Sequence, residues 1–587
     1  MEDEKQRERG SGASSFAARW RAELLCALLL ALAAGMMLQT AWRKSLTIDE
    51  PLLIAAGYYH LARGDYRPVN EHPPFSKSIS AVPLLLAGAG GPPIDPAAHH
   101  DYEYFLNLFD KFWRANKARY EWLTFLARVP AVLVTVTLGA LVFVYARRYW
   151  GERAALFAVA LFAFEPTVLA HGRVVQTDIP SALALLLFSF TFYEYLKGPT
   201  ARGAVYTGLA AGFAAVTKFS MIVLGPVVLA ASAVLILFAP RWKLGRGRAA
   251  AQGLVVALAA VLAVNAAYLF HGGQPEPFES AMARSVVPQG LQQSMHGPLS
   301  AGYRALQTIF PSDFVSGIGW QLAHARNGHP AGLLGMHSIR GWWYYFPVAF
   351  ALKTTLPFLL VSAAAVLWGV LRLRRGAEGR LLVLLVPLAL FTLLLLMSTI
   401  NIGVRYYLPA YPFLFILGGA FLDDFMRRGR HRLLLSSLVV VGVLCWGAVE
   451  AGRSHPDHMT YVNQLASGRP HWWYLSDSNV EWGDDIRDMA LYLRERGERR
   501  VGAALLNWQV LGLYDIEQAA LVVPPGERPE RTRYTVVGAS LLNGSTMPGG
   551  FDHYIFTPDE RVNYFDQYRR RTPEKVFGGS IYLFRND

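Results

Sequence analysis

The stretch Thr47-Ile48-Asp49-Glu50 places two adjacent carboxylates just after the first long apolar segment of the chain. Carboxylates at the end of a membrane-spanning segment are costly to hold and often mark a functional site. Acidic residues are also common at solvated helix ends, which is the alternative interpretation of this pair. The choice between the two depends on how the rest of the chain is divided between membrane and water.

The composition indicates a polytopic membrane protein. Hydrophobic residues make up 53% of the 587 residues and charged residues only 17%, and the length exceeds that of one ordinary soluble domain. A formal net charge of +13 would suit nucleic-acid binding in a soluble protein. Here the basic residues form short runs between apolar segments, as cytoplasmic loops do. We therefore expect membrane lipids, and no nucleic acid, as partners.

About eleven segments approach the roughly 20 apolar residues that a membrane-spanning helix requires. The first is not followed by a cleavage site of small residues, so we expect a retained span. The sequence therefore predicts an all-α polytopic membrane protein. The eleven segments lie near Ala22–Trp42, Phe125–Ala146, Ala154–Ala170, Ile179–Leu196, Gly203–Thr217, Ser220–Ala239, Ala250–Phe270, Pro347–Leu371, Leu381–Met397, Tyr406–Phe421 and Leu433–Val449.

The loops on the two sides of these segments differ in charge. Alternate loops each carry several basic residues, whereas the opposite short loops contain only Arg173, Lys218 and Arg405. Basic loops face the cytoplasm, so the N-terminus is expected there, as in a bacterial inner membrane protein. Residues 47–122 and 271–345, together with the tail, are then expected outside the cytoplasm.

The chain is expected to divide near residue 450, into a membrane domain (1–450) and a small extracytoplasmic α/β domain (451–587). Apolar periodicity in the first outer segment predicts two helices on the membrane surface, and the tail predicts one helix and four short strands. The helices are expected at Leu52–Leu61, Phe75–Leu86 and Asp484–Arg496, and the strands at Arg500–Leu506, Ala519–Val523, Tyr534–Ala539 and Ser580–Phe584.

Asp49 and Glu50 are candidate catalytic residues, because a carboxylate can take a proton from an acceptor hydroxyl. A second acidic element follows in Asn70-Glu71-His72-Pro73-Pro74, where the two prolines impose a rigid turn. Glu71 with His72 could also begin a divalent-metal site, although the sequence shows no further ligands for it. A metal cofactor therefore stays open, with Glu71 as its candidate ligand.

Three further charged residues are candidates on the same side. Asp178 is a candidate catalytic carboxylate, although at a helix start it could act as a helix cap. Lys218 and Arg405 could bind a phosphate, or could extend their charged ends to the membrane interface. The sequence contains no P-loop and no dinucleotide-binding motif. If the protein is a transferase that works outside the cytoplasm, a membrane-borne, phosphate-linked donor therefore fits better than a nucleotide sugar.

These motifs resemble those of the GT-C glycosyltransferases, in particular the protein O-mannosyltransferases and the bacterial lipid A aminoarabinose transferase. The likeness consists of a span ending in Asp-Glu, a His-Pro-Pro element, Arg-x4-Asp before a later span, and Lys-Phe-Ser, within about Ser45–Phe219. Gly341–Lys353 and Asn401–Pro412 resemble bacterial members more weakly. The segment Asp477–Asp485 (DSNVEWGDD) is similar to a DSNLDWGQD motif of those bacterial members.

The resemblance implies transfer of a sugar from a polyprenyl-phosphate-linked donor to a hydroxyl of a protein, lipid or glycan acceptor outside the cytoplasm, as in the mannosyltransferases. It implies Asp49 as the catalytic carboxylate and Glu50 as the residue that orients the site. Asp178 would support the acceptor or the sugar. Lys218 would hold the lipid phosphate, and the residues expected to bind substrate are Lys218, Arg405, Arg173, His72 and Glu71.

Many relatives carry a histidine shortly after the Asp-Glu pair. This chain has Leu52 and Leu53 there, so that role is absent here or has moved to His60. The alternative function is that of a transporter or flippase of lipid-linked sugars, which would bind with the same charged residues and break no bond. Transporters place charges near the bilayer midplane and often contain inverted repeats. The charges here lie at the outer ends of spans and no repeat is visible, which favours an enzyme.

Overall fold

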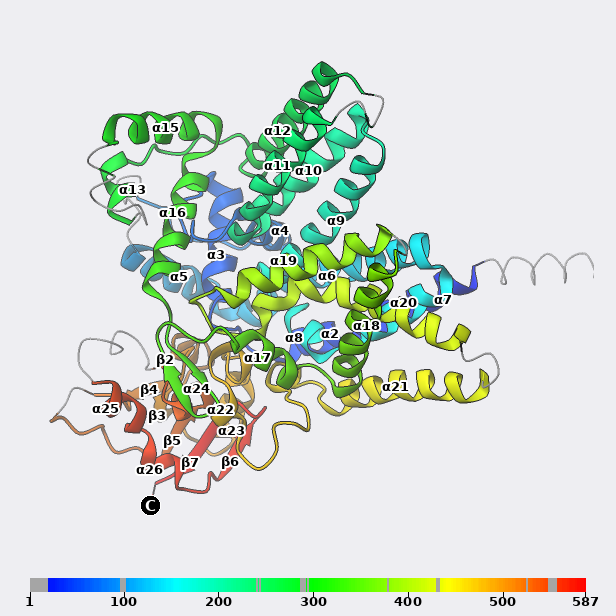
Figure 1. Cartoon of the computed structure of the whole chain (residues 1–587). Helices are drawn as coiled ribbons and strands as arrows, with labels where there is room; N and C mark the ends of the chain where they lie inside the picture. Colours follow the sequence, from blue (N-terminus) through cyan, green and yellow to red (C-terminus); the bar gives the residue numbers. More distant parts are fainter. Residues whose placement is uncertain are drawn as a thin grey trace, which may run out of the picture.

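Long helices make up most of the chain, and a small sheet domain near the C-terminus packs against one end of them (Figure 1). The computed structural model describes residues 20–95, 102–238, 241, 244–284, 292, 295–376, 379–428, 433–523, 526–546 and 557–586. The charged segment before residue 20, on which part of the topology prediction depends, lies outside these ranges.

Nine helical segments of the described chain are long and apolar enough to cross a membrane. This confirms the prediction of a mostly helical, polytopic membrane protein, but not the count of eleven spans. The segments are Arg21–Arg43 (α2), Lys117–Trp150 (which contains α6, Tyr120–Trp150), Asp178–Lys197 (α9), Phe219–Leu237 (which contains α11, Leu224–Leu237), Arg246–Ala267 (α12), Leu356–Arg374 (α18), Gly379–Leu396 (which contains α19, Leu382–Leu396), Val404–Arg428 (which contains α20, Tyr411–Arg428) and Leu434–Arg453 (within α21, Leu433–Arg453).

The two remaining expected spans form shorter helices. The segment expected at Ala154–Ala170 divides into α7 (Glu152–Ala163) and α8 (Pro166–His171), because proline cannot continue the first helix but is well suited to begin the second. Helix α10 (Ala201–Thr217) has 17 residues. At 1.5 Å per residue it is about 25 Å long, less than the roughly 30 Å of a bilayer's hydrocarbon core.

The two outer segments contribute short helices and one hairpin. The two helices predicted in the first segment are present, and the first of them, α3, is buried over most of its length instead of lying exposed on a surface. It packs against the other two helices of this segment. The elements are α3 (Glu50–Arg63), α4 (Pro74–Leu86), α5 (Tyr102–Ala115), α13 (Phe278–Arg284), α15 (His296–Ile309), α16 (Ser312–Asn327), β1 (Ala331–Leu333), β2 (Met336–Ser338) and α17 (Tyr345–Lys353).

The C-terminal domain contains a mixed five-stranded sheet of order β4-β3-β5-β7-β6. β3 pairs in parallel with β4 and β5, whereas β7 is antiparallel to β5 and β6. All four predicted strands and the predicted helix are present, and only the three-residue β6 was not predicted. The elements are α22 (His471–Tyr474), α23 (Ile486–Glu495), β3 (Arg500–Ala504), β4 (Glu517–Ala520), β5 (Tyr534–Gly538), α24 (Ala539–Asn543), α25 (Pro558–Asn563), α26 (Asp566–Arg569), β6 (Lys575–Phe577) and β7 (Ile581–Arg585).

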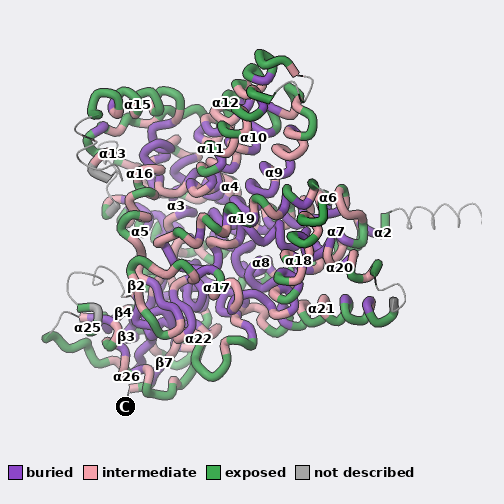
Figure 2. The backbone as a smooth tube through the Cα atoms, in the orientation of Figure 1, coloured by how far each residue is buried: buried purple, intermediate pink, exposed green. Residues whose placement is uncertain are grey.

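The C-terminal domain and the helices meet in a buried junction. Helix α21 ends at Arg453, so the division expected near residue 450 falls in the last turn of a helix. The backbone N–H groups of Ser45 and Ile48, just after α2, donate to the carbonyl oxygens of Asp484 and Trp482 at 2.9 and 2.8 Å. Figure 2 shows that buried positions are concentrated in the sheet and around α8. This junction adjoins the candidate site.

Candidate active site

Asp49 is the accessible member of the acidic pair. It immediately precedes α3, and its side chain is 29% exposed. Gln176 donates from Nε2 to Asp49 Oδ2 at 2.7 Å, and Arg405 Nη1 lies 3.4 Å from the same oxygen. Among the described residues no hydrogen bond reaches Oδ1, so this oxygen is free to accept a proton. Burial raises the pKa of Asp49, the Arg405 guanidinium opposes the rise, and neighbouring carboxylates add to it.

Glu50 is closed off from solvent by a buried ion pair. Arg128 Nη2 donates to Glu50 Oε2 at 2.5 Å and Arg128 Nε to Oε1 at 2.8 Å, and neither side chain is exposed. The backbone N–H groups of Thr47 and Val175 also donate to this carboxylate, at 2.8 and 3.1 Å. Burial alone would raise the pKa of Glu50, but Arg128 and these donors hold it below its usual value. The geometry therefore suits a residue that orients the Asp49 segment.

Asp178, Lys218 and Arg405 converge on one another. Lys218 Nζ lies 2.5 Å from Asp178 Oδ1, and Arg405 Nη1 lies 3.6 Å from Asp178 Oδ2. Lys218 also lies 4.0 Å from the centre of the Tyr406 ring. Asp178 is the first residue of α9, and Thr177 occupies the N-cap position. Asp178 Oδ1 accepts from Lys218, and Oδ2 accepts no hydrogen bond among the described residues. The alternative of a simple helix cap therefore does not describe Asp178, which lies between the two cations.

Glu71 and His72 lie at the border of this cluster. Burial raises the pKa of Glu71, Lys77 opposes the rise, and the charge of Asp49 adds to it. Burial, together with the charges of Lys77 and Arg405, lowers the pKa of His72 to about 3, which keeps the imidazole neutral. Over the described part of the chain, no three His, Cys, Asp or Glu side chains are grouped as metal ligands would be. Glu71 is therefore not part of such a group among the described residues.

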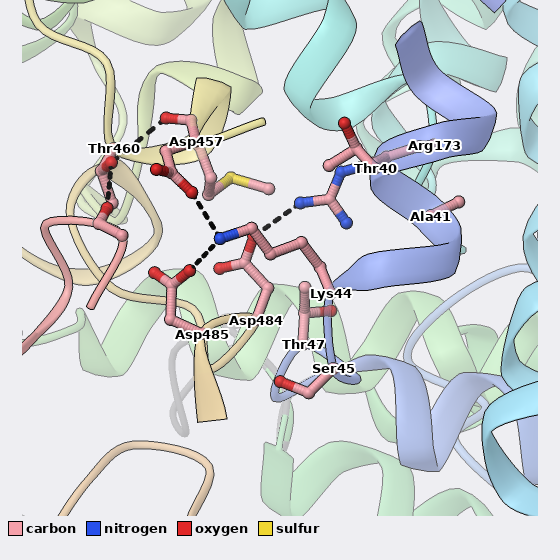
Figure 3. Close-up of polar contacts among 12 residues, drawn as sticks. Thr40, Ala41, Lys44, Ser45, Thr47, Arg173, Asp457, Thr460, Asp484 and Asp485 are labelled. Carbon is pink, nitrogen blue, oxygen red and sulfur yellow. Dashed lines mark hydrogen bonds and ion pairs between the residues drawn. The ribbon is translucent and has the colours of Figure 1, made fainter. Parts of the chain in front are cut away.

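Arg173 takes part in the junction with the C-terminal domain. Its Nη2 donates to Asp484 Oδ2 at 2.5 Å, and both side chains are almost fully buried. Beside this pair, Lys44 Nζ contacts the carboxylates of Asp457 and Asp485 (Figure 3). The structure therefore places Arg173 in a network that joins the two domains, apart from the pair of Lys218 with Asp178.

Sequence reasoning missed several residues that surround these charges. Arg128 lies inside the expected span Phe125–Ala146, where a charge in apolar sequence is itself a signal. Gln176 stands two residues before Asp178 and had been given no role. Ser478 and Trp482 contact Arg405 from the C-terminal domain. Both residues belong to the DSNVEWGDD motif. The sequence shows this motif but does not predict its position beside Arg405.

α9 and α3, the helices that begin at Asp178 and immediately after Asp49, each line a cavity. A strongly apolar groove of about 560 Å³ follows α9, α11 and α19, and Leu185, Met221, Leu224 and Phe391 contribute to its walls. A second cavity of about 280 Å³ lies among α3, α5 and α16, with Leu52, Glu71 and Trp320 in its lining. In Figure 1 these three helices lie to the left of those that line the groove.

Comparisons with known proteins agree with the resemblance seen in the motifs. Residues 123–266, which include Asp178 and Lys218, match the family model described as dolichyl-phosphate-mannose-protein mannosyltransferase. The fold is similar to ArnT from Cupriavidus metallidurans bound to undecaprenyl phosphate, at 14% identity and a TM-score of 0.46, covering 95% of this chain and 97% of that one. It is also similar to the oligosaccharyltransferase AglB from Archaeoglobus fulgidus in complex with an inhibitory peptide and a dolichol-phosphate, at 12% identity and a TM-score of 0.47, covering 89% and 70%.

No curated protein matches the sequence significantly. The family match over residues 123–266 nevertheless confirms the predicted likeness to the protein mannosyltransferases among the GT-C glycosyltransferases. The matched segment excludes Asp49 and Arg405, and the structural likeness is distant. The roles of the site residues therefore rest on the geometry of this chain.

Proposed function

We propose that this protein is an integral-membrane glycosyltransferase that moves a sugar from a polyprenyl-phosphate-linked donor to an acceptor hydroxyl, in the manner of the mannosyltransferases it resembles. The observation that carries the proposal is the arrangement of charges around Asp178. Two cations, Lys218 and Arg405, converge there within 3.6 Å, beside the accessible carboxylate of Asp49. In this proposal the site faces the extracytoplasmic side of a bacterial inner membrane.

The donor would place its phosphate at Lys218 and Arg405 and its chain in the groove. Met221 and Leu224 line that groove and follow Lys218 directly in the chain, so a bound chain would lead toward the cations. Asp178 keeps the two cations together, and Tyr406 covers the Lys218 ammonium group. Preorganised cations stabilise the negative charge that develops on a leaving phosphate. We therefore assign Asp178 to the phosphate side of the reaction.

The acceptor would approach Asp49 from the second cavity. Leu52 lines this cavity and lies one helical turn after Asp49, so both face the same side of α3. Glu71 lines the same cavity and lies within the electrostatic influence of Asp49. An acceptor in this position has the free oxygen of Asp49, Oδ1, available to take its proton.

In the proposed step, the acceptor oxygen forms a bond to the anomeric carbon as the bond between that carbon and the phosphate oxygen breaks. The polyprenyl phosphate leaves with the bonding electron pair and becomes a dianion, whose added charge the two cations stabilise. The proton of the acceptor hydroxyl passes to Asp49 and then to water. Because the leaving group needs no proton, the site requires no general acid, in contrast to glycoside hydrolysis.

A donor panel tests the proposed reaction. The purified protein in lipid nanodiscs is supplied with polyprenyl-phosphate sugars, polyprenyl-diphosphate sugars or nucleotide sugars, and mass spectrometry follows the release of the carrier and the glycosylated product. We expect release of polyprenyl monophosphate from monophosphate donors alone. In proteoliposomes, movement of intact donor across the bilayer with no carrier release would instead support a flippase and contradict the proposal.

A further inference from the structure

The segment Asp477–Asp485 of the C-terminal domain contacts both halves of the proposed site. On one side it adjoins the 3₁₀-helical turn Val404–Ala410, which carries Arg405. On the other side it pairs with the backbone of residues 45–48, which lead directly into Asp49. Arg405 and the backbone of residues 45–48, which lie more than 350 positions apart in the chain, are thus joined by one nine-residue segment.

Ser478 and Trp482 hold the Arg405 guanidinium from two directions. Arg405 Nε donates to Ser478 Oγ at 3.1 Å, and this hydroxyl in turn donates to the carbonyl oxygen of Ile402 at 2.6 Å. The guanidinium carbon lies 4.5 Å from the centre of the Trp482 ring, which is almost fully buried. Nε is therefore occupied and one face is covered, while Nη1 points toward the carboxylates of Asp49 and Asp178.

The backbone of the Arg405 turn is fixed by the same segment. Val404 N donates to Asn479 Oδ1 at 2.9 Å. A Cβ atom on Gly403 would lie 2.3 Å from Ser478 Oγ, so the turn approaches Ser478 more closely than a side chain at this position would allow. The turn and the segment are therefore in close contact at Gly403 and Ser478.

The contacts on the Asp49 side are made by backbone groups. Ile48 N donates to Trp482 O at 2.8 Å, and Ser45 Oγ donates to Gly483 O at 2.7 Å. Gly483 has a φ of 93°, and a Cβ atom there would lie 2.5 Å from the Asn507 side chain. Trp482 thus contacts Arg405 with its ring and holds Ile48, the residue next to Asp49, with its backbone carbonyl oxygen.

We propose that Ser478 and Trp482 are positioning residues for Arg405, so that the C-terminal domain completes the phosphate-binding half of the catalytic site. This inference rests on the proposed function, because it gives Arg405 the task of binding the donor phosphate. It also assigns a role to the DSNVEWGDD segment. This segment orients the Arg405 guanidinium and connects it to residues 45–48, which lead into Asp49.

A double-mutant cycle tests this role through binding of undecaprenyl phosphate to the full-length protein in nanodiscs. We expect Ser478→Ala and Trp482→Leu each to raise the Kd by about 3- to 30-fold, in line with the loss of one charge-assisted hydrogen bond or one desolvated cation–π contact. In the Arg405→Ala background the same substitutions should change the Kd by less than about 2-fold, because the group they position is gone.

Conservative and surface variants separate positioning from loss of folding. Trp482→Phe keeps an aromatic face under Arg405 and should restore most of the affinity that Trp482→Leu loses. Ser467→Ala and Trp508→Phe alter exposed side chains of the same domain and should bind as the wild type does.

The outcomes distinguish the two proposals. Wild-type protein that fails to bind the phosphate lipid would overturn the proposed function and this inference together. Wild-type binding that depends on Arg405, but with Ser478 and Trp482 effects that are negligible or persist at full size without Arg405, would overturn this inference alone.

Discussion

Replacement of Glu50 by glutamine asks whether this carboxylate orients the site or takes part in the chemistry. Glu50 and Arg128 are both fully buried, and the substitution keeps the shape while leaving the Arg128 charge without its counterion. Removal of one partner of a buried ion pair costs about 3–5 kcal/mol of unfolding free energy. We expect a loss of this size in Glu50→Gln, with donor affinity retained at temperatures where the protein stays folded, because Lys218 and Arg405 do not contact Glu50.

The assay is detergent-induced unfolding in mixed micelles, combined with donor binding and transfer measured on the same preparation. Glu121→Gln is the matched control, since Glu121 pairs with Arg487 at 2.7 Å in a partly exposed ion pair. Its loss should change the unfolding free energy by no more than about 1 kcal/mol. The reasoning is refuted if Glu50→Gln is as stable as Glu121→Gln and still loses transfer, because Glu50 would then act directly in the reaction.

Three further results are expected. Burial raises the pKa of Asp49 against the opposing charge of Arg405. Because a base acts only when it is deprotonated, the transfer rate should rise with pH, and the midpoint of this rise should lie above the ordinary aspartate pKa of about 3.9. A midpoint at or below that value would contradict the assignment of Asp49 as the base. Lys218→Gln should raise the donor concentration for half-maximal rate by about 10- to 150-fold, the equivalent of about 1.5–3 kcal/mol for a hydrogen bond to a charged group. The exposed Lys575 on β6 gives a Lys575→Gln control that should match the wild type. Lys44→Met should lower the thermal unfolding midpoint, because Asp485 loses its buried partner. Burial raises the pKa of Asp485 to about 7 even with Lys44 opposing it, so protonation favours the folded state and the variant should be closer to wild-type stability at pH 6 than at pH 8; equal losses at both pH values would argue against this pairing.

The sequence was most informative where charge interrupts apolar sequence. Asp49, Asp178, Lys218 and Arg405 all stand at the ends of apolar segments, where a charged side chain is costly, and the structure brings all four together. The sequence predicts their common location from the loop charges, which are expected to assign each segment end to one side of the membrane.

Partners that are distant in the chain could not be predicted in this way. Arg173 has the same sequence signal as Lys218, but its partner Asp484 lies 311 positions further along the chain. The contact of Trp482 with Arg405 likewise depends on how the C-terminal domain docks onto the helices. The count of eleven spans is not confirmed. One reason is local, since hydrophobicity continues through Pro166 although the helix does not.

The most direct test of the proposed chemistry is single-turnover transfer by Asp49→Asn, with donor binding measured on the same protein. The substitution removes the proton acceptor and keeps the shape of the side chain. We predict that the Kd for the polyprenyl-phosphate sugar stays within about 3-fold of wild type, while the rate of carrier release with product formation falls by about 10²- to 10⁴-fold, as expected when a general base is lost. Transfer at more than a tenth of the wild-type rate, with donor binding intact, would contradict the assignment of Asp49 as the base.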